Sequence, residues 1–110
     1  MYICLNYSSM NKIVTDRIDE LIQLCKAYSV QSMYAFGAVC TDTFNDKSDI
    51  DFLITFEKLP AAQNADNYVD LHHKLQEMFG RRIDLLTDLT ISNPYTIERI
   101  EQTKQLIFEA

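Results

Sequence analysis

The spacing of apolar residues along this chain predicts alternating helices and short strands. In three segments apolar positions recur every three or four residues, as in helices with one buried face. Shorter apolar runs between them are typical of strands. In chain order the predicted elements are a helix over residues 11–28, strands over 32–36 and 49–56, a helix over 62–79, a strand over 82–87, a helix that begins at Pro94, and an edge strand over 106–108. This order, α-β-β-α-β-α with a last β, predicts a small α+β domain.

Residues that favour turns and caps support several of these boundaries. Ser8 or Ser9 is expected near the start of the first helix, and Pro60 marks the exit from the second strand. Gly80 is suited to the left-handed position that follows a helix, because glycine has no Cβ to resist it. The second helix is therefore expected to end at residue 79.

The third helix has a start signal of its own. Pro94 fits the first helical position, where the missing N–H costs nothing, and Ser92 or Asn93 would cap it. Ile97 and Ile100 follow at helical spacing and are predicted to face inward.

Composition limits the domain count and the kinds of partner. A length of 110 residues with 47% apolar content indicates one domain, residues 1–110, with a single modest core. The longest apolar runs fall short of the roughly 20 residues that span a bilayer, and the chain does not open with a basic-then-apolar leader, so a cytoplasmic location without a membrane partner is expected. A formal net charge of −6 argues against bulk nucleic-acid binding, although divalent ions can bridge an acidic protein to a nucleotide. The oligomeric state, including a homo-oligomer, stays open.

Three cysteines, Cys4, Cys25 and Cys40, cannot all pair with one another. They show no C-x-x-C spacing, so neither a disulfide framework nor a zinc site is indicated. Reduced structural thiols are expected.

The second predicted strand begins with an unfavourable pair of charges. Asp49 and Asp51 are two residues apart, so a strand directs both carboxylates to one side, where they repel each other. Mg²⁺ binds carboxylate oxygens and substrate phosphates, and two such ions roughly 3.5–4 Å apart can clamp a phosphoryl transfer. A third carboxylate is then expected on a neighbouring strand, and Asp84 supplies one within an apolar run. The alternative is a solvated strand start after a polar turn.

With an upstream glycine, these carboxylates resemble the signature of the minimal nucleotidyltransferases of the DNA polymerase beta superfamily. That signature is Gly-Ser, ten residues, then Asp-x-Asp, and here Gly37 and Ala38 are followed by ten residues and by DID at 49–51. The segment GRRIDLLT, residues 80–87, is similar to the family's third-carboxylate strand, and NPYTIERIEQTKQLI to the tails of small bacterial members. The resemblance covers nearly all of residues 34–110. It implies a small mixed β-sheet with helices packed on one side.

The resemblance also implies roles for the matching residues. Asp49 and Asp51 would be metal ligands, and Asp84 would hold one metal ion or act as the base for the attacking hydroxyl. Gly37 would let the backbone approach the phosphates. Ala38 departs from the family pattern, which has a serine whose hydroxyl meets phosphate. Losing one hydrogen bond to a charged group costs about 1.5–3 kcal/mol, or roughly 10- to 150-fold in binding or rate.

Other polar residues near these motifs carry two interpretations each. Lys47 and Arg82, with Arg81, could reach a triphosphate, and each is equally compatible with an ordinary surface charge. His72 and His73 are adjacent and point in different directions on a helix, which favours a hydrogen-bonded core histidine at His72 over a metal pair. With only two glycines in the chain, a Rossmann fingerprint or a P-loop is impossible.

The function implied by the resemblance is transfer of AMP from ATP onto a hydroxyl, with two Mg²⁺ ions. The chain leaves little room for an acceptor domain, which indicates a protein acceptor, and the family implies a HEPN-domain toxin with this chain as its antitoxin. One alternative is a module that keeps the fold without transfer activity and neutralises its partner by covering it, which Ala38 favours. Another is a catalytic subunit that modifies a small molecule such as an aminoglycoside.

Overall fold

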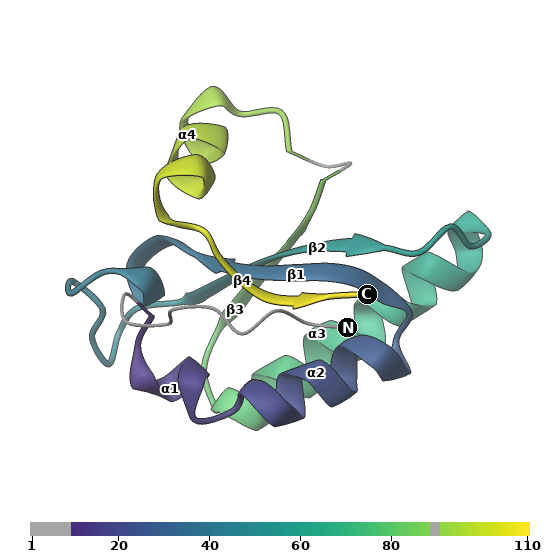
Figure 1. Ribbon diagram of the computed structural model, residues 1–110, viewed down its shortest axis with the longest axis horizontal. Helices are drawn as coiled ribbons and strands as arrows, with labels where there is room; N and C mark the ends of the chain where they lie inside the picture. The colour runs from purple at the N-terminus through teal and green to yellow at the C-terminus, as the bar shows by residue number, and fades with distance from the viewer. Residues whose placement is uncertain (1–9, 89–90) are drawn as a thin grey trace.

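One four-stranded mixed sheet organises the chain (Figure 1). The computed structural model describes residues 10–88 and 91–110, so the expected features at Cys4, Ser8 and Ser9 lie outside the described residues. In chain order the elements are α1 (Lys12–Thr15), α2 (Ile18–Ala27), β1 (Val30–Phe36), the 3-10 helix η1 (Gly37–Cys40), β2 (Ile50–Phe56), α3 (Ala61–Phe79), β3 (Ile83–Thr87), α4 (Pro94–Thr103) and β4 (Gln105–Glu109). The predicted α+β class is confirmed.

The first predicted helix is wrong as one continuous element, because it is divided into α1 and α2. Asn11 caps α1, with its Oδ1 accepting the Ile13 N–H at 2.9 Å. The Asn11 N–H itself donates to the Val39 carbonyl in η1 at 2.7 Å, which ties α1 to the segment after β1. At Arg17 the backbone turns to φ −117° and ψ 15°, outside the helical region, and α2 starts in a new direction.

The sheet order is β3-β2-β1-β4, which places β4 at an edge as predicted. Strand β1 pairs antiparallel with both β2 and β4, and β2 pairs parallel with β3. The parallel pair requires a crossover, and α3 supplies it, as the rule for parallel neighbours demands. Gly80 ends α3 in the left-handed conformation, with φ 62° and ψ 30°, and Asn93 caps α4 through the Tyr95 N–H at 2.9 Å. Both predicted helix boundaries are confirmed.

The two faces of β2 meet different surroundings. Ile50, Phe52 and Ile54 are fully buried, and the Phe52 ring lies 6.0 Å from that of Phe79 in α3. Asp51 points to the other face, since side chains alternate along a strand. Helices α2 and α3 therefore cover one face of the sheet with the hydrophobic core between them.

Helix α4 departs from the single-sided packing expected from the sequence. It stands on the opposite side of the sheet from α2 and α3 (Figure 1) and contacts β1 and η1. Ile100 is buried there, whereas Ile97 is 44% exposed, so the prediction that both face inward is wrong for Ile97. Tyr95 is also highly exposed, because the first half of α4 leans away from the sheet. Within the described ranges, the helices are too short or too polar to cross a membrane.

Both cysteines in the described ranges are buried free thiols, as predicted. Burial raises the pKa of Cys25 to about 12 and that of Cys40 to about 11, and the nearby Asp51 charge adds to the rise at Cys40. Both thiols are therefore protonated at neutral pH and have low reactivity.

Candidate active site

Three neighbouring strands place one row of side chains on the face of the sheet that α4 overhangs. Asp51 in β2 lies opposite Phe36 in β1 and opposite Asp84 in β3. Residues directly opposite each other in a sheet point to the same side. The register therefore brings Asp51 and Asp84 side by side from segments more than 30 residues apart, close enough for the Asp84 charge to raise the pKa of Asp51.

Asp51 is only 5% exposed, which is unusual for a residue with a charged side chain. Burial raises the pKa of this carboxyl from 3.8 to about 6, because the ionised form loses solvation. The Arg99 charge opposes that rise, and the Asp84 charge adds to it. A buried carboxylate beside a second carboxylate is a place where a cation is strongly favoured.

Arg99 of α4 supplies positive charge to this pair. Its guanidinium Nη2 lies 2.8 Å from Asp51 Oδ2, and its Cζ lies 5.7 Å from the centre of the Phe36 ring. The Arg99 side chain is 53% exposed, so it approaches the buried carboxylate from the solvent side. Sequence reasoning missed this residue, because it stands 48 positions from Asp51 and on a face of α4 that local periodicity does not mark as functional.

Gly37 opens the turn between β1 and η1 and lies against the same ion pair. Its φ of 75° is in the left-handed region, and a Cβ at this position would collide with the Asp51 carboxylate and the Arg99 guanidinium. The Gly37 N–H donates to Thr103 Oγ1 at 2.7 Å, and that hydroxyl donates to the Arg99 carbonyl at 2.6 Å. The glycine identified from the sequence is thus required both for its conformation and for close approach.

Asp49 lies just before β2 and is separate from the buried pair. Its side chain is half-exposed, and Asp49 Oδ2 lies 3.7 Å from Arg82 Nε. In residues 10–88 and 91–110, the His, Cys, Asp and Glu side chains do not form a cluster of three or more suited to a metal ion. The structure therefore brings Asp51 and Asp84 into contact and leaves Asp49 paired with Arg82.

Arg81 organises the polar loop that leads to Asp49. Its Nη1 donates to the carbonyls of Asn45 at 3.2 Å and Ser48 at 2.9 Å, and its Cζ lies 4.7 Å from the centre of the Phe44 ring. Lys47 projects from the same loop with an exposed side chain, and its backbone N–H donates to Asn45 Oδ1 at 2.9 Å. Arg81 therefore has a structural role, whereas the heads of Lys47 and Arg82 remain accessible to a ligand.

Ala38, the position that departs from the family serine, is half-buried in η1. Its carbonyl accepts from Thr41 Oγ1 at 2.9 Å, and that hydroxyl lies 2.8 Å from Thr43 Oγ1. The segment after Gly37 therefore carries hydroxyl groups near the position where the family has its serine.

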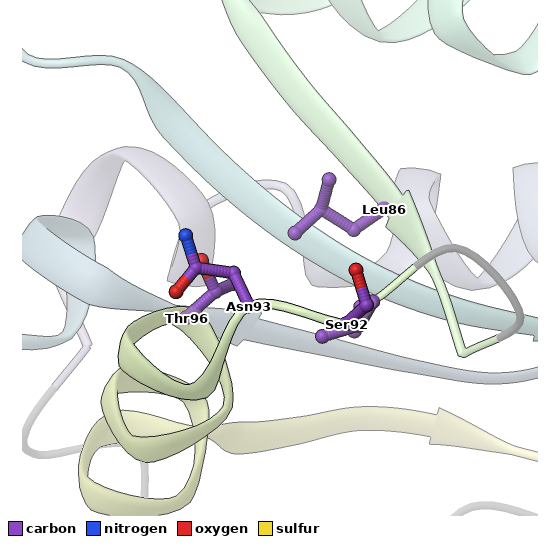
Figure 2. Close-up of a pocket in the computed structure, with 5 residues that line it drawn as sticks. Leu86, Ser92, Asn93 and Thr96 are labelled. Atoms are coloured by element: carbon purple, nitrogen blue, oxygen red, sulfur yellow. The ribbon is translucent and has the colours of Figure 1, made fainter.

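Asp51 and Asp84 together form the carboxylate row of the sheet. A small cavity lies on the same face of the sheet, next to this row. Leu86 follows Asp84 by two residues in β3 and therefore points to the same side. The cavity measures about 160 Å³, similar to an engineered cavity of about 150 Å³ that holds one benzene ring. It lies between β3 and the start of α4 (Figure 2) and is lined by Leu86, Ile91, Ser92, Asn93 and Thr96.

A larger groove of about 790 Å³ lies at the other ends of β2 and β3, beside the start of α3. It includes Thr55, Tyr68 and Thr87 but none of the site residues predicted from the sequence. Size alone would favour this groove as the ligand site. The buried charge of Asp51 instead favours the carboxylate row as the ligand site, because ionisable groups with a shifted pKa are concentrated at functional sites and the groove does not include Asp51.

Two polar side chains of α3 support β3 from the core side. Tyr68 donates its hydroxyl to the Leu85 carbonyl at 2.6 Å, and His72 Nε2 lies 2.8 Å from the Ile83 carbonyl. Burial raises the pKa of Tyr68, and the Asp84 charge adds to the rise. His72 is a hydrogen-bonded, half-buried histidine, as expected from its position.

The family model described as polymerase beta, nucleotidyltransferase, matches residues 19–110. The chain therefore belongs to this nucleotidyltransferase family, as a minimal nucleotidyltransferase domain. Two curated relatives come from Methanocaldococcus jannaschii, and both bear the name "Putative protein adenylyltransferase". One is 31% identical over 75 residues, with 68% of this chain and 74% of the relative covered. The other is 32% identical over 79 residues, with 72% and 78% covered.

Solved structures share the fold at low sequence identity. A protein described as a "putative minimal nucleotidyltransferase" matches with a TM-score of 0.70 and 21% identity, covering 89% of this chain and 97% of that one. A toxin–antitoxin crystal structure with AMP-PNP matches with a TM-score of 0.65 and 19% identity, covering 84% of this chain and 73% of that one. The structure of the tri-AMPylated Shewanella oneidensis HEPN toxin in complex with MNT antitoxin matches with a TM-score of 0.60 and 17% identity, covering 87% of this chain and 72% of that one.

Proposed function

We propose that this chain transfers AMP from ATP to a hydroxyl group of a HEPN-domain toxin and thereby acts as its antitoxin. The observation that carries the proposal is the side-by-side placement of the buried Asp51 and the half-buried Asp84, with Gly37 against Asp51. Two relatives named as protein adenylyltransferases and neighbours that are toxin–antitoxin complexes support the acceptor class.

The chemistry is a displacement at the α-phosphorus of ATP. The acceptor oxygen forms a bond to that phosphorus, the bond to the bridging oxygen breaks, and pyrophosphate leaves. The acceptor proton passes to a carboxylate, for which Asp84 is the best placed, because it is half-buried on the open face and Arg99 contacts Asp51 instead. Positioning and charge neutralisation contribute most of the catalysis in such transfers.

Asp51 and Asp84 are suited to hold Mg²⁺, with Asp49 as a further oxygen donor. Carboxylate oxygens are the ligands this ion prefers, and a buried carboxylate next to a second one lacks enough positive charge without it. Mg²⁺, when bound, neutralises charge on the triphosphate and on the leaving pyrophosphate. Lys47 and Arg82 extend from the surrounding loops toward solvent and would bind the outer phosphates.

The ring-sized cavity beside Leu86 would take the base of the nucleotide. It lies one row from Asp84 on the same face, and its apolar wall of Leu86 and Ile91 suits a flat aromatic ring. The hydroxyl and amide groups of Ser92, Asn93 and Thr96 line the rest and offer hydrogen bonds to its polar edge.

Calorimetry of ATP binding tests the proposal. ATP should bind in the presence of Mg²⁺ or Mn²⁺, and binding should disappear in the double variant Asp49→Asn, Asp51→Asn. The variant Asp16→Asn, Asp19→Asn removes the same charge from two exposed positions, at the end of α1 and in the first turn of α2, and serves as the matched control. Binding that does not need a divalent ion, or that survives in the site variant, would overturn the metal-dependent mechanism.

Labelled ATP tests the acceptor. Incubated with this chain and the product of the neighbouring gene, it should label the neighbour, and Asp51→Asn should abolish the label. An unlabelled neighbour in the presence of ATP binding would argue against a protein acceptor.

A second candidate is a module that neutralises its toxin by complex formation without transferring AMP. Ala38 favours it, because the hydroxyl of the family serine is missing at this position. The Ala38→Ser variant separates the two. It should strengthen ATP binding or transfer by roughly 10- to 100-fold if the site is active, and it should change neither if the chain only covers its partner.

A further inference from the structure

A side chain of α4 holds the carboxylate oxygen that a metal ion would need. Arg99 Nη2 contacts Asp51 Oδ2 at 2.8 Å, while Asp84 lies directly beside Asp51 on the neighbouring strand. Among the described residues, Asp51 is the only buried charged side chain, so its partner decides how the site is neutralised. The Arg99 side chain is half-exposed, so its guanidinium can move away from the Asp51 carboxylate into solvent without passing through the core.

The contact is built into the local structure on three sides. Gly37 leaves the space that both the carboxylate and the guanidinium fill. The Phe36 ring lies beneath the guanidinium at a distance suited to a cation–π interaction. The Thr103 hydroxyl joins the Arg99 carbonyl to the Gly37 N–H, which fixes the end of α4 over the carboxylate row.

We propose that Arg99 is an internal counterion for Asp51 and competes with divalent cations for its carboxylate. The inference rests on the proposed function and adds a positioning residue to it. In the metal-free protein Arg99 keeps Asp51 in place and lowers the affinity for a cation alone. When the cation arrives with a nucleotide, the released guanidinium gains a new anionic partner in the phosphates, so cation and nucleotide bind cooperatively.

Mn²⁺ binding to the full chain at pH 8, followed by calorimetry or by electron paramagnetic resonance, tests the competition. Removing the competitor in Arg99→Gln should tighten Mn²⁺ binding without nucleotide by roughly 1.5- to 5-fold, the range for a solvent-exposed ion pair. The increase in Mn²⁺ affinity that AMP-PNP produces in the wild type should become smaller in the variant. Arg17→Gln, which breaks a surface pair with Glu20 on α2, removes the same charge elsewhere and should change neither quantity.

A measurement on the wild type needs no substitution and covers the case in which Arg99→Gln fails to fold. The side-chain nitrogen signals of Arg99 in ¹⁵N nuclear magnetic resonance should shift when Mg²⁺ and AMP-PNP are added together. Arg99 side-chain signals that stay in place while the backbone amide signals of Asp51 and Asp84 move would overturn the inference.

The outcomes also separate the two proposals. If the wild type binds neither Mn²⁺ nor AMP-PNP, both the proposed function and the role of Arg99 are overturned. If the wild type binds both ligands, but folded Arg99→Gln binds Mn²⁺ no more tightly, only the role of Arg99 is overturned.

Discussion

The substitution Asp51→Asn is expected to stabilise the metal-free protein at pH 8 while it removes metal and nucleotide binding. Asparagine has nearly the same shape as aspartate and can still accept a hydrogen bond from Arg99, but it carries no charge to desolvate. If the protein becomes more stable when Asp51 is replaced, then the charge of Asp51 lowers the stability of the fold, as is common for residues of functional sites.

The expected size follows from the pKa of Asp51, which rises from 3.8 to about 6 in the fold. Between these values the folded protein keeps a proton that the unfolded chain has released, so the unfolding free energy falls as pH rises through this window. Above it the wild type has lost about 3 kcal/mol, at about 1.36 kcal/mol for each pH unit. This pKa already includes the attraction of Arg99, so a net gain of about 1–3 kcal/mol is expected for asparagine at pH 8.

Urea unfolding of both proteins with chelator, at pH 4 and at pH 8, measures this difference. The two unfolding free energies should agree within about 1 kcal/mol at pH 4 and diverge at pH 8. Titrating groups that the Asp51 charge does not influence cancel in the comparison, because they are common to both proteins. Asp16→Asn, at an exposed pair with Lys12, is the control and should show no such divergence. If Asp51→Asn is less stable at pH 8, or if the gap does not depend on pH, the Asp51 charge is not costly in this fold.

Three further substitutions test separate parts of the structure. Gly37→Ala should destabilise the protein more than Gly80→Ala in thermal unfolding. Both glycines have positive φ, so either substitution costs about 1–2 kcal/mol, but a Cβ at Gly37 would also collide with neighbouring side chains, which adds about 1–3 kcal/mol. Equal losses would contradict this crowding at Gly37. Thr96→Phe should fill the ring-sized cavity and weaken ATP binding by about tenfold or more while leaving tripolyphosphate binding unchanged, and an equal loss for both ligands in calorimetry would place the base elsewhere. Tyr68→Phe removes the bond to the Leu85 carbonyl and should lower the unfolding free energy in urea by about 1 kcal/mol, whereas no change would mean that water replaces the hydroxyl.

Strand patterns in the sequence allowed the pairing of Asp51 with Asp84 to be predicted, but the same reasoning placed Asp49 beside Asp51, whereas Asp49 lies before β2 and pairs with Arg82. Asp51 and Asp84 each fall within a run of apolar residues that alternate with them, so both had to point away from the core. The ten-residue spacing from Gly37 and Ala38 to the Asp49-Ile50-Asp51 motif then indicated the family and, with it, a small mixed sheet. These features depend on local pattern, and local pattern is what a single sequence records.

The features that could not be predicted depend on contacts between distant segments. Arg99 reaches Asp51 because α4 lies on the opposite side of the sheet from α3, which its own periodicity does not reveal. The first helix is divided at Arg17, and α1 is tied to η1 by the bond from the Asn11 N–H to the Val39 carbonyl, a contact that no local rule gives. The exposure of Ile97 likewise follows from how α4 leans over the sheet.

The parallel alignment of β2 with β3 has a consequence for how this protein tolerates insertions. If β3 slid past β2 by a single position, Asp84 would exchange places with an apolar neighbour and end up beneath the sheet, facing α3. Extra residues in the turn before α3 leave that alignment untouched, whereas one extra residue inside β3 would reverse it. A cation bound by both Asp51 and Asp84 would therefore stabilise only the alignment in which these residues lie opposite each other.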